Sequence, residues 1–85
     1  MPKFYFHLRH RGEFLRDHTG ADFPNAELAR GNGIQLGSQL CRVGGEMVEH
    51  SAIEIADESG KLLEVIKVRD CRATTHGSAL KPLRP

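Results

Sequence analysis

The sequence predicts a two-layer α+β domain of ββαββ order, in which a four-stranded antiparallel sheet carries one helix packed on one face. Three patterns indicate this fold. Apolar and polar residues alternate near the N-terminus, a helical stripe runs from Asn25 to Val43, and two more strand-like segments follow Ser51. The 85 residues have room for one domain, which we assign to residues 1–69, followed by a poorly ordered tail at residues 70–85.

The first two strands are predicted to form a hairpin. Phe4, Phe6 and Leu8 fall on one side of the opening strand, and the polar residues between them fall on the other. The turn at residues 10–12 returns the chain over residues 13–17, because its glycine tolerates the positive φ of a tight loop. We expect the three apolar side chains to face the helix.

The predicted helix begins near Pro24 or Asn25, with Glu27 in its first turn, where a negative charge meets the positive end of the helix dipole. Its apolar stripe should lie on the sheet, because the members recur at helical spacing. They are Ala29, Gly33, Leu36, Leu40 and Val43.

Glycines interrupt this helix at Gly31, Gly33 and Gly37, although each weakens an isolated helix by about 1 kcal/mol relative to alanine. Our hypothesis is that they allow the helix backbone to approach the sheet closely. After them, Gly44-Gly45 either ends the helix or precedes a short extra turn through Glu49, and the pattern does not choose between the two.

The second hairpin is predicted over residues 51–68. Ile53 and Ile55 share one side of its first strand, and residues 57–60 form a type I turn followed by a left-handed glycine. In its second strand two apolar sets compete for the buried side. One set is Leu62, Ile66 and Val68 together with Glu64, and the other is Leu63 and Val65 together with Lys67.

The composition of the chain narrows the classes of function that it could serve. A formal net charge of +1, with 27% charged and 39% hydrophobic residues, is typical of a globular protein and not of a strongly basic nucleic-acid binder. The chain shows no signal peptide and no apolar stretch long enough to span a membrane, so we expect a cytoplasmic protein without a membrane partner. Cys41 and Cys71 lack a CxxC spacing, and we expect free thiols in that compartment.

No pattern in the chain predicts catalysis, and we expect no enzyme activity and no cofactor. None of the serines lies in a Gly-x-Ser-x-Gly elbow, and the glycine-rich segment 31–37 has the wrong spacing for a dinucleotide fingerprint. His7, His10 and His18, with Asp17 and Glu13, suggest a metal site near the first hairpin. However, His7 and His10 point to opposite sides of a strand, so we predict no metal ligands.

The side of the sheet that the helix leaves uncovered is the candidate interaction surface. Its candidate residues are Tyr5, His7, Arg9 and Arg16. The first hypothesis is an interaction module that pairs with itself or with a protein partner through this side or an edge strand. The alternative is a weak binder of single-stranded nucleic acid, in which aromatic and basic side chains stack bases and contact phosphates. Several acidic residues dilute such a patch: Glu13, Asp17, Glu54 and Glu64.

Several short motifs resemble one family. They are the opening Met1-Pro2-Lys3-Phe4-Tyr5-Phe6-His7-Leu8-Arg9, then Gly12-Glu13, Asp17-x-x-Gly20, Glu27-Leu28-Ala29-Arg30 and Ile53-Glu54-Ile55-x-Asp57-Glu58-x-Gly60. Over about residues 1–68 the chain is similar to a family of short bacterial proteins classed as a domain of unknown function. The resemblance implies a small domain with no established activity, cofactor or catalytic residue. Members tend to have alanine in the helix where this chain has its glycines.

Overall fold

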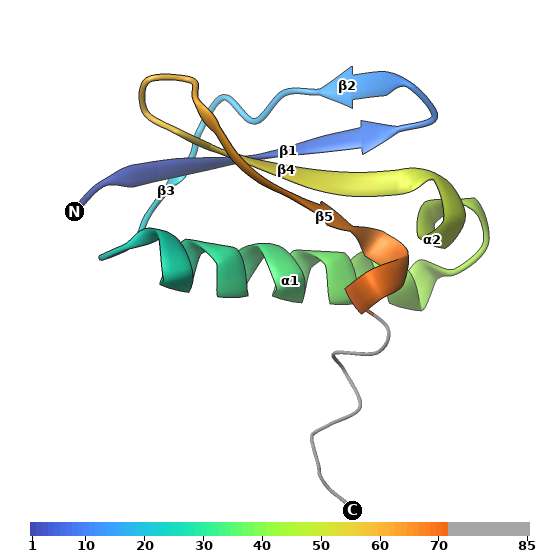
Figure 1. Ribbon diagram of the computed structural model, residues 1–85. Helices are drawn as coiled ribbons and strands as arrows, with labels where there is room; N and C mark the ends of the chain where they lie inside the picture. The colour runs from blue at the N-terminus through green and yellow to red at the C-terminus, as the bar shows by residue number, and fades with distance from the viewer. Residues whose placement is uncertain (72–85) are drawn as a thin grey trace, which may run out of the picture.

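A computed structural model describes residues 1–71 of the chain. Its elements are β1 (Lys3–His10), β2 (Glu13–Leu15), β3 (Ala21–Asp22), α1 (Ala26–Val43), α2 (Glu46–His50), β4 (Ser51–Asp57), β5 (Leu62–Lys67) and the 3-10 turn η1 (Val68–Asp70). Helix α1 lies along one face of the sheet, and within the described residues no helix covers the opposite face (Figure 1). The predicted α+β class is confirmed.

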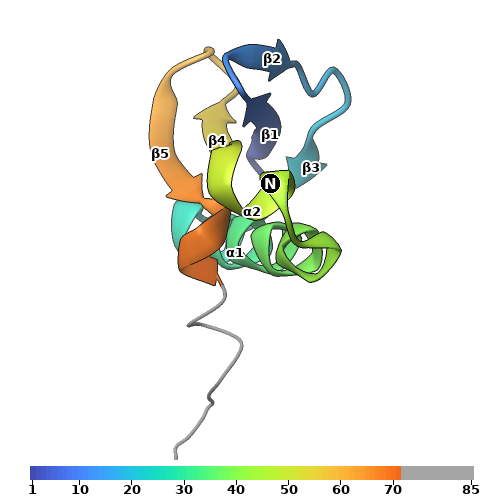
Figure 2. The same cartoon turned by 90° about the vertical axis from the view of Figure 1, so that its right-hand side faces the viewer.

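The sheet is antiparallel, with the strand order β2-β1-β4-β5. The two-residue strand β3 also pairs with β1, through Lys3 and Phe4, so β2 and β3 lie along the same edge of β1 (Figure 2). Sequence patterns missed β3, because two residues are too few to show alternation. Strand β2 ends at Leu15, two residues earlier than predicted, where the chain leaves the ladder and forms a loop around Asp17.

The core lies between α1 and the inner face of the sheet. Phe4 is buried, and Phe6 and Leu8 pack against a cluster that includes Ile53 and Ile55 of β4. The expected orientation of β1 is therefore confirmed, because its even-numbered apolar side chains face the helix.

Helix α1 begins as predicted. The side chain of Asn25 accepts a hydrogen bond from the backbone N–H of Leu28 at 2.9 Å, which caps the first turn. The helix ends at Val43, Gly44 adopts a positive φ of 77°, and the chain then forms the separate helix α2. Val43 was predicted to face the sheet, and this was wrong. It is 70% exposed, because the helix stops there and the chain turns away.

One of the three helix glycines lies against the sheet. A Cβ on Gly33 would lie 2.8 Å from Cδ1 of Ile55, so the hypothesis of close approach to the sheet is confirmed there. At Gly37 a Cβ would collide with Sγ of Cys71, which follows η1 and is not part of the sheet. The hypothesis fails at Gly31, where a Cβ would meet nothing within 4 Å.

The second hairpin closes as predicted, with Gly60 at a φ of 89° and its N–H donating to the carbonyl of Asp57. The structure also settles which side of β5 is buried. Ile66 and Val68 face the helix, and Glu64 on the same side accepts a hydrogen bond from Arg30 of α1 at 2.6 Å. Grouping Leu62 with them was wrong. The register shifts at Leu63, so Leu62 lies opposite Ala56 on the outer side and is 51% exposed.

The described fold continues two residues beyond position 69. Cys71 follows η1, is 1% exposed and packs in the core cluster. The tail predicted from residue 70 onward therefore begins within the packed part of the chain, and its remainder, residues 72–85, lies outside the described residues.

Candidate functional site

The outer side of the sheet, which we call the open face, consists of three rows of side chains that cross the strands. The register places them opposite one another: Phe14, Arg9, Ala52 and Lys67 in the first row, His7, Glu54 and Val65 in the second, and Tyr5, Ala56 and Leu62 in the third. Directly opposed residues of antiparallel strands point to the same face. The open face thus combines aromatic, charged and small residues.

His7 is the buried residue at the centre of this face. Its ring lies 5.1 Å from that of Phe14 and is stacked with the ring of Tyr5 at 6.3 Å. Its Nδ1 accepts a hydrogen bond from the backbone N–H of Asp17 at 2.9 Å. A nitrogen that accepts a hydrogen bond carries no proton, so Nδ1 is the acceptor in this contact.

Asp17 organises the loop between β2 and β3. Its carboxylate accepts hydrogen bonds from the backbone N–H groups of Phe6, Thr19 and Gly20. Burial raises the pKa of this carboxyl, but these three bonds and the nearby His7 outweigh burial and hold the pKa below its usual value. Asp17 thereby occupies the part of the β1 edge that neither β2 nor β3 covers.

Arg9 has two partners on the open face. Its Nε donates to Oε2 of Glu54 at 2.6 Å, and its guanidinium lies 4.7 Å from the centre of the Phe14 ring. The ion pair joins the first row of side chains to the second. Since Glu54 balances its charge, Arg9 is a weaker anchor for an external phosphate than a free arginine.

Two hollows border the open face, one toward each end of β4. The first lies at the end of the sheet, between the β1–β2 turn, α2 and the end of β5. It has a volume of about 320 Å³, and Ala52, Arg9 and Lys67 contribute to its lining from the open face. The second surrounds Ala56, has a volume of about 270 Å³ and is bordered by Tyr5. Ala52 lines the first hollow and Ala56 the second, and Glu54, which pairs with Arg9, lies between these two alanines along β4.

The hollows differ in charge. Residues with basic side chains dominate the first: Arg9, Arg11, Lys67 and Arg69, against the single acid Glu49. Acidic residues dominate the second: Asp17, Asp57 and Glu58, against Arg16 and the neighbouring His18. We call them the basic hollow and the acidic hollow. The open face is therefore basic at one end of its strands and acidic at the other.

Strand β5 forms the free edge beside these hollows, since within residues 1–71 it pairs only with β4. Three of its apolar side chains are exposed: Leu62, Leu63 and Val65. Leu63 is the extra residue where the register shifts between Ile55 and Ala56. An apolar free edge is a ready template for pairing with another chain.

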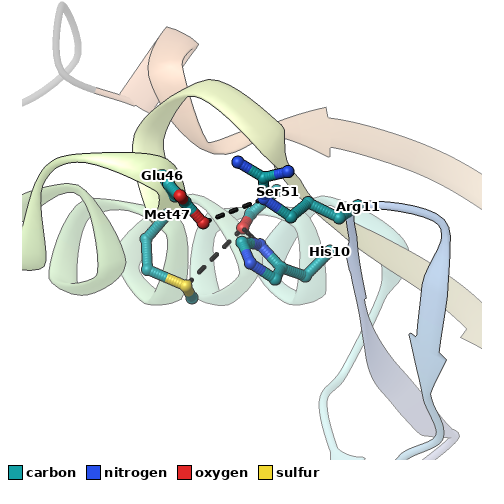
Figure 3. Close-up of polar contacts among 5 residues, drawn as sticks. All are labelled: His10, Arg11, Glu46, Met47 and Ser51. Carbon is teal, nitrogen blue, oxygen red and sulfur yellow. Dashed lines mark hydrogen bonds and ion pairs between the residues drawn. The ribbon is translucent and has the colours of Figure 1, made fainter.

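The nearest approach to catalytic geometry lies at the other side of the sheet (Figure 3). Nδ1 of His10 lies 2.7 Å from Oγ of Ser51, its directly opposed residue, and Oγ of Ser51 also contacts Sδ of Met47. In the same corner Arg11 forms an ion pair with Glu46 at 2.9 Å. These contacts tie the end of β1 to α2.

A serine nucleophile needs an accessible hydroxyl and a histidine that a third group holds in place. Ser51 is only 6% exposed, and among the described contacts Glu46 binds Arg11, not His10. We therefore interpret the His10–Ser51 contact as a cross-strand bond that stabilises the corner.

Within residues 1–71, no group of three His, Cys, Asp or Glu side chains lies close enough to hold a metal ion. His7 faces outward and His10 inward, as the alternation of a strand requires. No helix in this described range is both long and apolar enough to cross a membrane.

The structure distributes the predicted surface residues over both hollows. Tyr5, His7 and Arg16 border the acidic hollow, and Arg9 borders the basic one. Sequence reasoning omitted Phe14 and Lys67 from this surface. The two-residue turn of the first hairpin fixes Phe14 opposite Arg9. The alternation of Ile53 and Ile55 already places the residues next to them in β4 on the outer face. Only the register identifies which residues of β5 lie beside these outer residues.

Together these features define a small α+β domain with one helix layer and an outer sheet face that no helix of the described residues covers. The chain belongs to a family described as a domain of unknown function, DUF6894, whose model matches residues 3–71. Comparison with curated proteins finds no match, and comparison with solved structures finds none either.

Proposed function

We propose that this domain is a non-catalytic interaction module that binds another polypeptide, a second copy or a different protein, through the open face and the β5 edge. The observation that carries the proposal is the exposure of apolar side chains along a free edge strand, with Val65 at 48% and Leu62 at 51%. Exposed apolar patches with polar surroundings are typical of interaction sites.

Several features of the same surface support this proposal. The basic and acidic hollows offer space for side chains of a partner, and Phe14 beside Arg9 provides an aromatic and an arginine, the residue types that dominate interface energies. A chain of this size buries little surface of its own, so an added partner contributes to its stability. We place this activity in the cytoplasm, where Cys41 and Cys71 remain thiols.

Binding of single-stranded nucleic acid is the weaker proposal. The ring pair of Tyr5 and His7 resembles a base-stacking platform, but His7 is buried beneath its neighbours. Arg9, which lies on the same side of β1 as these rings, already pairs with Glu54. The acidic hollow next to Tyr5 would repel phosphates.

The test replaces Val65 with lysine and uses Val43→Lys as the matched control. Both valines are exposed, but Val65 lies on the open face and Val43 at the end of α1. We measure sedimentation over a wide concentration range and the proteins retained from an extract of the natural host. The proposal expects Val65→Lys to lose association with a second copy or with the retained protein, while Val43→Lys keeps it. A wild-type chain that stays monomeric and retains nothing, or a Val65→Lys variant that binds like the wild type, contradicts the proposal.

A further inference from the structure

The charges of the open face make it complementary to itself, and from this we infer the partner. We propose that the open face pairs with the open face of a second copy, so that the basic hollow of each chain lies over the acidic hollow of the other. This inference rests on the proposed function, and names the partner that the interaction module binds. A symmetric dimer uses the same patch twice, so such a patch must complement itself.

The charge distribution selects one of two symmetric orientations. A two-fold axis parallel to the strands would place the first row of one copy over the first row of the other. The cations Lys67 and Arg9 of the two copies would then lie close together, which brings like charges together. A two-fold axis across the strands reverses the strand direction and places the first row of one copy over the third row of the other. Only the second orientation brings the basic end of one face over the acidic end of the other. Glu54 of each copy then faces Glu54 of the other, and each is paired with its own Arg9.

In this orientation β5 of each chain lies over β5 of the other. The axis passes close to the second row, so Val65 of each copy meets Val65 of the other and their exposed surface is buried. Lys67, at the end of β5, then faces Leu62 of the second copy, next to the loop at residues 57–61 that carries Glu58. By the register, Ala52 of each copy then faces Ala56 of the other, and Arg9 faces Tyr5.

The charges of Lys67 and Glu58 are available for contacts between the two copies. Within residues 1–71 the ion pairs join Arg9 to Glu54, Arg11 to Glu46 and Arg30 to Glu64, and neither Lys67 nor Glu58 takes part in them. Both residues are exposed. The chain has a formal net charge of only +1, so two copies do not repel each other strongly at a distance.

The test exchanges the two charges in separate chains. In Lys67→Glu and in Glu58→Lys, each homodimer contains two like-charge contacts, and we expect self-association to weaken about tenfold or more. Mixing the two variants restores an opposite pair at both ends of a heterodimer. Sedimentation of the equimolar mixture should therefore recover association close to that of the wild type.

Arg42→Glu is the control, because it makes the same charge change as Lys67→Glu in the last turn of α1. It should leave self-association unchanged, and circular dichroism should show every variant folded. The inference is overturned by a wild type that remains monomeric, by charge variants that associate like the wild type, or by a mixture that fails to recover. A monomer that still binds a different protein through Val65 would overturn this inference and leave the proposed function in place.

Discussion

The backbone N–H of Asp17 donates to Nδ1 of His7 at 2.9 Å, and the carboxylate of the same aspartate accepts the backbone N–H of Phe6 at 3.1 Å. One residue of a loop thus satisfies two groups of β1, one on its open face and one at its edge. Without Asp17, the middle of β1 would have no partner on this side, because β2 and β3 pair only with its ends.

Removing this residue should destabilise the domain. Asp17→Ala leaves the N–H of Phe6 without an acceptor, and an unsatisfied buried donor costs about 1–3 kcal/mol. Asp17→Asn keeps one acceptor oxygen and should lose less. Urea unfolding followed by circular dichroism measures both, and equal stability of all three proteins would contradict the role assigned to the carboxylate.

The stability that Asp17 supplies should depend on pH. Its pKa in the folded chain is below the usual value of 3.8, so the charged form is favoured by folding. The contribution is therefore fully present above that usual value and is lost as the pH falls through the lower pKa of the folded state. The stability difference between wild type and Asp17→Asn should shrink in acid, and a difference that grows as the pH falls would contradict this assignment.

The helix glycines should respond in opposite ways to alanine. Gly31→Ala meets open space and should stabilise the domain by up to about 1 kcal/mol through helix propensity. Gly33→Ala forces the buried side chains of Ile55 and Ile66 to move, and overpacking of a core typically costs about 1–3 kcal/mol. Thermal unfolding of the two variants provides a matched comparison, and a stabilised Gly33→Ala would show that the helix does not need its close approach there.

The two thiols should differ in reactivity. Burial raises the pKa of the Cys71 thiol, the nearby Cys41 and Asp70 raise it further, and the thiolate is the reactive form. Cys41 is only half-buried. Iodoacetamide followed by mass spectrometry should modify Cys41 first in the folded protein and both at similar rates in denaturant. Equal rates in the folded state would place Cys71 outside the core.

Much of the fold follows from local patterns. Phe4 and Ile55 face inward because alternation fixes the side of a strand, and Asn25 caps α1 because a short polar side chain can accept an early helix N–H. What failed depends on tertiary contacts. Val43 fits the helical stripe, but it is the last residue of α1. Strand β3 exists only because β1 offers an open edge to pair with.

Less of the candidate site than of the fold could be predicted from the sequence. Alternation placed Tyr5 and His7 on the outer face, but it gave no reason to join Phe14 and Lys67 to them, because these contacts depend on register. The side of β5 was also ambiguous, since both of its faces carry apolar residues. Ile66 and Val68 occupy the buried side, and Glu64 on that side pairs with Arg30 of α1 at the surface.

The most direct test of the account is to map which amides respond when the wild-type protein is diluted. Amide proton–nitrogen correlation spectra recorded over a wide concentration range should shift at Val65, Lys67 and Glu54 and remain constant along α1. Shifts confined to α1, or spectra that do not change at any concentration, would contradict an open face that binds a second copy.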